Sequence, residues 1–447
     1  MNGELNRRRF IEHAAVIGGV LGCRPAAVEA RDSDGLDRLR PIGLARGVHP
    51  GRVVWVHDPD VTDWAGPGEG HWYDPQHLSQ DRVSAMMEQA VCQLAGESSV
   101  GAAWKALFRH FNQGRGRADT EYRAGEKLAI KPNWVGMIWR EGNVDLETYR
   151  LIRRQDYMNT APQMLIALID QLVSAAGVAP ADITVCDTLA YMAEEYYRPM
   201  RDAFPDVAYE DFGGQAGRRP VRASSVPFYW SCRPEGVATD YVPESFARAD
   251  YLINFANLKA HTGAGVTLCA KNHFGSLVRW PVQAGYYNMH RHCFTKKTAV
   301  YRENVDLLGH AQLGGKTVLN LIDGLFPGKH PIDHAPRRWD SPPFDGHWAC
   351  SLLASQDPVA IDSVGFDFLW SEWSDHPRNP GADDYLHEAA LAHDPPSGTF
   401  YDPNHPTDQQ RLASLGVHEH WNNARDRQYS RNLEAGEGIE LVAVRSG

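Results

Sequence analysis

The 447-residue sequence lacks several features that would indicate a function class directly. None of its seven cysteines forms a C-x-x-C pair, so no spacing supports an iron–sulfur cluster or a zinc ribbon. No apolar run reaches the roughly 18 residues that a membrane-spanning helix needs. The net charge of −11 argues against a broad nucleic-acid-binding surface, which would need clustered basic residues. No stretch has the H-E-x-x-H spacing of a zinc peptidase.

The composition is that of a globular protein with a large core. Hydrophobic residues make up 43% of the chain and charged residues 23%. Both values are ordinary for globular proteins, so we expect no disulfide or metal to be needed to hold the core together. The length corresponds to two or three domains of average size, although α/β folds often run longer as one domain.

The N-terminal residues have the pattern of an export signal. Arg7 and Arg8 precede Phe10, and a short apolar run from Ala14 to Gly22 follows. The paired arginines resemble those of twin-arginine signal peptides. We therefore expect export by the twin-arginine machinery, which carries folded proteins, and a periplasmic or other extracytoplasmic location. The alternative interpretation is a basic amphipathic helix of a cytoplasmic protein.

This pattern sets the expected division of the chain. Residues 1–30 would hold the signal peptide and the start of a linker, residues 31–50 the linker, and residues 51–447 an α/β domain. The stretch "VLGC", which ends at Cys23, resembles a lipoprotein cleavage box. A lipid on Cys23 is the only membrane attachment that we expect.

The body of the chain alternates between short apolar runs and helical patterns. Strands are predicted in RVVWVHDPD, KLAIKPNW, DITVCDT, VAYEDF, DYLINFANL, KTVLNLIDG, CSLLAS and GIELVAV. Helices are predicted at 79–95 and 98–112 and in APQMLIALIDQLVSAAG, AEEYYRPMRDAF and DPVAIDSVGFDFLWSEW. This order favours an α/β fold, in which helices cover both faces of a mostly parallel sheet. Residues 279–347, rich in His, Pro, Arg and Trp, are expected to form a loop-rich insertion.

Polar residues follow several of the predicted strands. In an open parallel sheet, ligands bind beyond the carboxyl ends of the strands. The residues delivered there are Lys131 and Asn133, then Asp187 and Thr188, then Asn257, Lys259 and His261, then Asp323, and finally Gln356 and Asp357. Each of these alone has a simpler explanation, because strands end at the surface. Together they predict a shared polar crevice.

The segment "NLKAHTGAGVTLCAKNHFGSL", residues 257–277, is the most unusual part of this crevice. We expect Gly263 and Gly265 to let the backbone turn closely into a helix, with amide groups exposed to an anion. A plain tight turn is the alternative. On the expected helix Lys271 lies among apolar residues, so it would extend its ammonium to solvent, pair with a carboxylate or act chemically. His273 is expected to be a histidine of the core.

These residues define the expected site. We predict His261, Lys271 and Asp187 as the catalytic set, with His261 as general acid and base and the other two adjusting its surroundings. The predicted substrate-binding residues are Lys131, Asn133, Asn257, Lys259, Gly263, Gly265 and Asp323. The expected ligand is a small anionic molecule, and no nucleic acid is expected.

A metal site is an open alternative, and the cofactor is not identified by the sequence. His290 and His292 are two residues apart and so lie on one face of an extended segment. His330, Asp333 and His334 form a second cluster. Imidazole and carboxylate together suit zinc, iron or nickel. No iron–sulfur cluster is expected.

Five motifs resemble those of a known family. In order, they are "KPNWV", "VCDT", "NLKAHTGAGVTLCAKNHFG", "LIDGL" and "SQDPVAIDSVG". The sequence resembles the domain-of-unknown-function 362 family over roughly residues 125–370. Members of that family often carry twin-arginine signals, and some carry a ferredoxin-like cluster module whose cysteines this chain lacks.

A second similarity is fainter. His261, a Gly-rich link and Lys271 look like a stretch of the nickel-pincer lactate racemase family. That resemblance would make His261 a proton-transfer base, Lys271 a cofactor anchor, and His290 or His292 a metal ligand.

The sequence therefore favours an exported α/β enzyme that performs acid/base chemistry on a small anionic metabolite. Two alternatives stay open. One is a periplasmic binding or cofactor-carrier protein without catalysis, and the other is a metal-dependent or redox enzyme that uses the histidines between residues 290 and 334.

Overall fold

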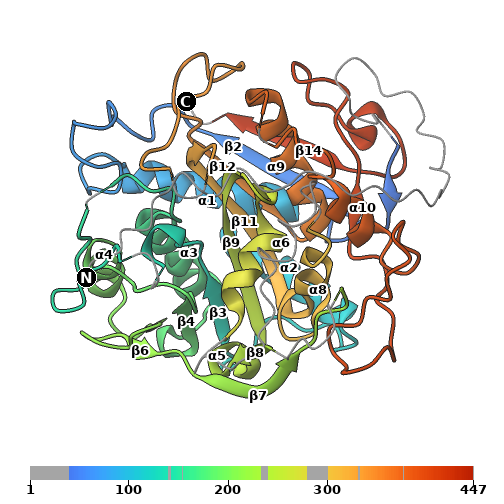
Figure 1. The fold of residues 1–447 in the computed structure, drawn as a ribbon, viewed down its shortest axis with the longest axis horizontal. Helices are drawn as coiled ribbons and strands as arrows, with labels where there is room; N and C mark the ends of the chain where they lie inside the picture. The colour runs from blue at the N-terminus through green and yellow to red at the C-terminus, as the bar shows by residue number, and fades with distance from the viewer. Residues whose placement is uncertain are drawn as a thin grey trace, which may run out of the picture. The chain divides into compact units, whose positions relative to one another are not determined.

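The computed structural model describes residues 40–138, 142–153, 155–232, 240–278, 301–330, 333–375 and 377–445. These residues lie in one unit of the chain, Arg38–Gly447. At its centre the described residues form a ten-stranded sheet, with β9 and β11 near the middle (Figure 1). The predicted export signal and linker up to residue 39, including Cys23, lie outside the described residues, as do His290 and His292.

The sheet is mostly parallel, as predicted. Its strands in spatial order are β14 (Glu440–Arg445), β2 (Arg52–His57), β12 (Ser351–Ser355), β11 (Thr317–Gly328), β9 (Tyr251–His261), β3 (Leu128–Lys131), β4 (Ile183–Cys186), β5 (Ala208–Asp211) and β6 (Arg219–Pro220), with β10 (Gly265–Thr267) beside β9. Strand β12 runs antiparallel to both of its neighbours, and β10 runs antiparallel to β9. The other neighbouring pairs are parallel.

Two small strand pairs lie outside this sheet in the described part of the chain. Strand β1 (Ile42–Gly43) pairs with β13 (Val417–His418), and β7 (Ala223–Phe228) pairs with β8 (Asp240–Pro243). The first of these pairs joins the start of the described chain to its C-terminal part.

Helices cover both faces of the sheet. One face packs against α1 (Gln80–Ala95), α2 (Val100–Gly114), α3 (Pro162–Ser174) and α4 (Glu194–Ala203). The other face packs against α5 (Glu244–Arg248), α6 (Cys269–Asn272), α8 (Asn304–Gly309) and α9 (Pro358–Glu372), with α10 (Asp384–Ala390) packed on α8 and α9. Among the described helices, none combines the length and apolar character needed to cross a bilayer.

Short 3-10 turns complete the described elements. They are η1 (Val135–Met137), η2 (Pro180–Asp182), η3 (His273–Ser276), η4 (Gly314–Lys316) and η5 (Ser430–Leu433). Of these, η1 and η3 lie next to the ends of β3 and α6 and help to shape the site described below.

Local sequence signals explain where the main helices begin and end. The hydroxyls of Ser79 and Ser99 accept hydrogen bonds from the amides of Arg82 and Ala102, and so cap α1 and α2. Helix α1 ends at Gly96, whose φ of 70° favours glycine. The predicted helices at 79–95 and 98–112 are therefore confirmed to within two residues.

Strand β9 extends further than the sequence indicated, and the helix expected after it is wrong. The strand continues through Asn257 to His261, buried along its whole length. The chain then reverses and pairs back on itself as β10, and only Cys269–Asn272 form a short α-helix. The reason is that the glycines support a tight reversal between strands, with φ of 80° at Gly265, rather than a helix start.

The direction of strand β12 shows that the expected position of Gln356 and Asp357 is wrong. Because it is antiparallel, its carboxyl end lies at the opposite edge of the sheet from the ends of its neighbours. Asp357, which follows it, accepts hydrogen bonds from the amides of Val359 and Ala360 and caps α9. Gln356 bonds the backbone at Val48 and Val318. These two residues are therefore not part of the expected crevice.

The described part of residues 279–347, which were predicted as a loop-rich insertion, contains both regular secondary structure and irregular backbone. Residues 279–300 lie outside the described residues. The described part contains α8 and β11, a buried strand of twelve residues at the centre of the sheet. Irregular backbone follows in the described residues 329–330 and 333–350.

Candidate active site at the strand ends

A cavity of about 280 Å³ lies where the parallel strands β3, β4 and β9 end. Its described lining combines polar residues with an apolar wall. The polar residues are Lys131, Asn133, Asp187, His261, Thr262, Thr267, Lys271, Asn272 and His330. The apolar wall is formed by Val135, Ile138, Leu189 and Phe274, next to Gly275. The structure therefore brings together five of the residues selected from the sequence for this crevice, Lys131, Asn133, Asp187, His261 and Lys271.

Lys131 is the centre of a buried hydrogen-bond network. Its side chain is only 1% exposed, and its Nζ lies 3.1 Å from Asp187 Oδ2, which is itself 7% exposed. The same Nζ donates to Asn272 Oδ1 at 3.1 Å and to the carbonyl of Pro132 at 2.5 Å. A lysine ammonium has three donors, and these three acceptors use all of them. Lys131 therefore contributes charge to the cavity but no further hydrogen bond.

Asp187 and Asn272 fix that lysine in place. Asp187 also accepts from the amides of Trp134 and Leu189, at 3.3 and 3.0 Å. The Nδ2 of Asn272 donates to the backbone oxygen of Lys131, and its Oδ1 also accepts from Asn133. Gly275 allows this close packing, because a Cβ there would lie 2.9 Å from the Lys131 Nζ.

His261 has a defined protonation pattern. Its Nδ1 accepts hydrogen bonds from the amides of Gly263 and Ala264, at 2.9 and 3.0 Å. A nitrogen that accepts cannot carry a proton, so the neutral ring holds its proton on Nε2. The ring lies 6.0 Å from that of His330, centroid to centroid, and both residues line the cavity.

These hydrogen bonds also determine what the amides of the glycine turn, residues 263–265, contact. The sequence predicted that Gly263 and Gly265 would present amide groups to an anion. In the structure the amide of Gly263 donates to His261 Nδ1, and Gly265 pairs with His261 across β10 and β9. The turn thus positions the imidazole, and its effect on a ligand is exerted through that ring.

Lys271 and Thr267 complete the polar wall. Lys271 is 8% exposed and its Nζ lies 5.8 Å from the centre of the Phe274 ring. Thr267 is 2% exposed, and within the described structure its hydroxyl has no hydrogen-bond partner. The Oδ1 of Asn133 is likewise buried without a partner in the described residues. Buried polar atoms cost free energy when they are unsatisfied, so these two indicate a polar ligand or water.

Asn257, Lys259 and Asp323 lie apart from the described cavity lining. Asn257 and Asp323 are opposite one another in the pairing of β9 with β11. Asp323 accepts from the amides of Ala161 and Leu325, and burial raises its pKa to about 6. Lys259 donates to the carbonyl of Met158. Burial and the neighbouring Lys271 lower the pKa of Lys259 well below its ordinary value, against the effect of Asp323.

His273 is a core histidine, as predicted. It is fully buried and its Nδ1 lies 3.2 Å from the hydroxyl of Ser276. Burial lowers its pKa to about 3, and the charge of Lys131 adds to this effect. His273 is therefore neutral at physiological pH.

The histidines from the predicted insertion do not form a metal group in the described residues. His330 lines the cavity, whereas the ring of His334 packs against Tyr157 at 6.1 Å. Asp333 lies near Arg337. Whether His290 and His292 bind a metal stays a prediction, because both lie outside the described residues.

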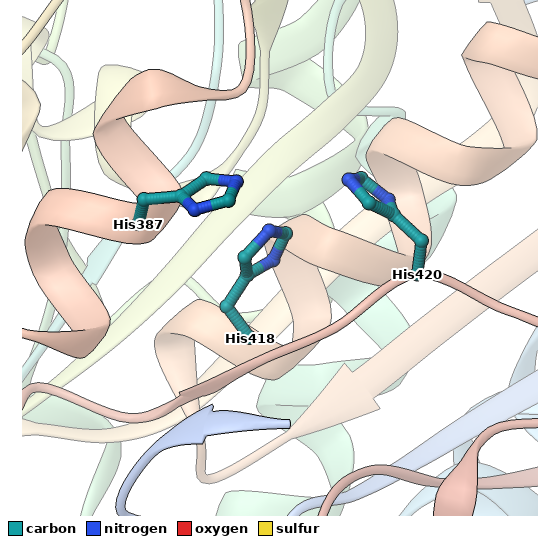
Figure 2. A group of neighbouring side chains, drawn as sticks. All are labelled: His387, His418 and His420. Carbon is teal, nitrogen blue, oxygen red and sulfur yellow. The ribbon is translucent and has the colours of Figure 1, made fainter. Parts of the chain in front are cut away.

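A different histidine cluster could hold a metal ion. His387, His418 and His420 each offer a ligand atom, and these atoms lie within 4.8 Å of one another. Figure 2 shows the three rings turned toward a common space, one from α10 and two from the segment that begins at β13. The sequence reasoning missed this cluster, although His418 and His420 have the same two-residue spacing as His290 and His292.

The family of the chain can now be stated. A family model described as Domain of unknown function (DUF362) matches residues 129–367, more than half of the chain. The chain belongs to the DUF362 family. The DUF362 match contains Lys131, Asp187, His261 and Lys271, and it ends before the histidine cluster. A search of curated proteins finds no match to the chain.

Proposed function

We propose that the cavity at the strand ends binds a small anionic metabolite and performs acid/base chemistry on it. The observation that carries the proposal is the charge of the described lining. The described lining contains two lysine ammonium groups, those of Lys131 and Lys271, and one carboxylate, that of Asp187. A concave site with an apolar wall and a surplus of positive charge suits a small organic anion.

In this proposal the Lys131 network is a fixed support. Its three acceptors hold the ammonium in place, so the charge is already oriented before a ligand arrives. A charge that does not reorganise stabilises a developing negative charge more effectively than a mobile one. Asp187 holds the side chain of Lys131 in position through their ion pair.

His261 acts as a neutral hydrogen-bond donor. Protonating its Nδ1 would break two amide hydrogen bonds, so the imidazolium form is disfavoured in this geometry. Its Nε2–H is suited to polarise a carbonyl or stabilise an oxyanion of the ligand. This role refines the general acid and base function expected from the sequence.

Proton transfer is assigned to Lys271. A largely buried lysine in the wall of a cavity can exchange a proton with a bound ligand that lies within hydrogen-bond distance of its Nζ. The hydroxyl of Thr267 and the Oδ1 of Asn133, which have no hydrogen-bond partner among the described residues, would orient the ligand beside it. Lys271 thus contributes to both binding and proton transfer, whereas Thr267 and Asn133 contribute to the orientation of the ligand.

A two-stage experiment tests the proposal. Thermal-shift screening of the full chain against small carboxylates and phosphates identifies ligands. Each ligand that stabilises the protein is then incubated with it in D₂O, and loss of its C–H signals is followed by ¹H NMR. We expect a small carboxylate to bind and to exchange a proton, and the Lys271→Arg variant to bind without exchange.

The outcomes separate the alternatives. Stabilisation without exchange in the wild type would favour a binding protein without catalysis. If no anion stabilises the wild type, or if ligands stabilise the Lys271→Met variant equally well, the proposed site is wrong.

We further propose that the chain is exported through the twin-arginine route and is periplasmic, with a lipid on Cys23. The support is the order of Arg7, Arg8 and Phe10 ahead of an apolar run. Fractionation of cells that express the Arg7→Lys, Arg8→Lys double variant tests export, and we expect the variant to stay in the cytoplasm. A Cys23→Ala variant released from the membrane fraction would support lipidation, whereas unchanged fractionation of both variants would contradict the proposal.

A further inference from the structure

The cluster of His387, His418 and His420 lies on the C-terminal side of the DUF362 match and shares no residue with the described cavity lining. We propose that these three histidines and Asp383 form a binding site for a divalent transition-metal ion, Zn²⁺ by preference, that fastens the C-terminal segment to α9. The site is independent of the function proposed for the cavity. Three features of the geometry support it.

The first feature is the orientation of His420. Its Nδ1 lies 2.6 Å from Asp367 Oδ1, on α9. The other oxygen of Asp367 accepts from the Trp421 amide and the Tyr429 hydroxyl, so the carboxylate acts as an acceptor throughout. The proton of the neutral ring is therefore on Nδ1, and the lone pair is on Nε2. That Nε2 is buried and has no hydrogen-bond partner within the described residues.

The second feature is the orientation of His418. Its Nδ1 lies 2.8 Å from the hydroxyl of Ser363, and that hydroxyl donates its own proton to the carbonyl of Val359. Ser363 can therefore only accept from His418, which fixes the proton on Nδ1 and leaves the lone pair on Nε2. Metal-binding histidines commonly have this arrangement, in which the second nitrogen donates to a carboxylate or another oxygen.

The third feature is the spacing around Asp383. Its Oδ2 lies 3.7 Å from the Nε2 of His387 and 3.7 Å from the Nε2 of His420. Both distances exceed a hydrogen bond, which joins such atoms at about 2.7–3.2 Å. Two ligands of a tetrahedral ion with bonds of about 2.0–2.1 Å are roughly 3.3–3.4 Å apart. Both distances are thus closer to the spacing of two ligands of one ion than to a hydrogen bond.

The donor set indicates the metal. Three imidazoles and one carboxylate suit Zn²⁺ better than Mg²⁺ or Ca²⁺, which prefer oxygen ligands. Four protein ligands are typical of a structural site, which has no open position for a substrate. The ion would join α10, the segment after β13 and, through Ser363 and Asp367, helix α9.

The competing interpretation is a metal-independent ion pair, in which a protonated His420 lies between Asp367 and Asp383. The test therefore measures metal directly in the full-length protein. Zn²⁺ is titrated into chelator-treated protein, and the bound metal is counted after desalting. We expect about one tightly held Zn²⁺ per chain, and Co²⁺ in its place should give the visible absorption of a four-coordinate site.

Two variants test the ligands without a large change in the core. His387 is only partly buried, so the His387→Ala variant should fold and lose stoichiometric Zn²⁺. Ser363→Ala removes the acceptor of His418 and should lower affinity by roughly 10- to 100-fold. Ser174→Ala is the matched control, because Ser174 makes the same hydroxyl bond one helical turn back, to Asp170, away from any histidine of the cluster.

The control should bind Zn²⁺ as the wild type does. Wild-type protein that retains no Zn²⁺ or Co²⁺ after titration would overturn the proposal. Zn²⁺ binding that is unchanged in the His387→Ala variant would also overturn it. Neither outcome bears on the cavity, because the anion screen does not depend on these residues.

Discussion

The strand-end cavity and the histidine cluster differ in whether their polar side chains already have protein partners. In the cavity, Lys131 already has a full set of partners, and Asp187 compensates its charge. In the cluster, hydrogen bonds at Nδ1 direct the Nε2 lone pairs of His418 and His420 away from Ser363 and Asp367. Within the described residues, the Nε2 of His420 has no hydrogen-bond partner. A hydrogen-bond network whose members all have partners can support a ligand that binds beside it. Ligand atoms that converge without contacting one another indicate an ion bound between them.

The cost of disrupting each region should therefore differ. Removing a member of the cavity network leaves a buried charge unpaired whether or not a ligand is present. Removing a member of the cluster should matter mainly when metal is present. Four predictions follow from this contrast.

The largest effect is expected for Asp187→Ala. The change leaves the buried Lys131 ammonium without its carboxylate, and breaking one side of a buried ion pair costs about 3–5 kcal/mol. Urea denaturation measures the free energy of unfolding. The control is Asp63→Ala, since the Asp63 side chain is 77% exposed in its pair with His77 and should contribute less than about 1 kcal/mol. Equal losses in the two variants would show that the Lys131 network is not the buried support inferred here.

Next in size is a pH effect at Asp323. Its folded pKa of about 6 exceeds the value of about 3.9 for an unfolded aspartate. The folded chain therefore holds the proton more tightly, and its stability falls as the pH rises from about 4 to about 6. The Asp323→Asn variant has no carboxyl group to titrate in this window. Its loss of stability from about pH 4 to about pH 6 should therefore be smaller than that of the wild type, by up to about 3 kcal/mol. Parallel stability curves for the two proteins at pH 4 to 7 would contradict the raised pKa.

Zn²⁺ should stabilise the folded protein by binding to the histidine cluster and not to the cavity. At a free Zn²⁺ concentration 100 times the dissociation constant, the folded protein should gain about 2.7 kcal/mol. The same gain should be seen in Lys271→Met, which alters the cavity, and should be absent in His387→Ala. Chemical denaturation with Zn²⁺ or with a chelator checks this. A gain that depends on Lys271 would place the metal in the cavity.

The smallest effect is expected for Gly275→Ala. The added Cβ would lie 2.9 Å from the Lys131 Nζ, so the lysine must shift and the variant should lose about 1–3 kcal/mol. Gly436→Ala is the control, because nothing lies within 4 Å of a Cβ at that position. Thermal melting of the two variants measures the difference. A similar melting temperature for both would mean that the packing around Lys131 is loose.

The cavity could be predicted from the sequence because it follows from sheet topology. Lys131 and Asp187 each come directly after an apolar run, and parallel neighbours deliver their ends to one edge. The same reasoning failed at Gln356 and Asp357, since no pattern in "CSLLAS" distinguishes an antiparallel strand from a parallel one. It also ended β9 too early, although Asn257, Lys259 and His261 alternate with Leu258 and Ala260 as a strand requires.

The histidine cluster could not be predicted in the same way. His418 and His420 have a spacing that places two imidazoles on one side of an extended segment, and this signal was present in the sequence. What the sequence does not contain is the meeting of that segment with α10, which supplies His387, and with Ser363 and Asp367 on α9. These contacts depend on tertiary packing between segments without a repeating pattern.

The central claim is that the cavity binds a small anion through Lys271, and isothermal titration calorimetry tests it most directly. The strongest carboxylate from the screen is titrated into the wild type, into Lys271→Met and into Lys105→Met, a control whose lysine side chain is 61% exposed. We predict that Lys271→Met weakens binding by at least about tenfold, or 1.4 kcal/mol, while Lys105→Met binds as the wild type does. Equal affinity for all three proteins would contradict the claim.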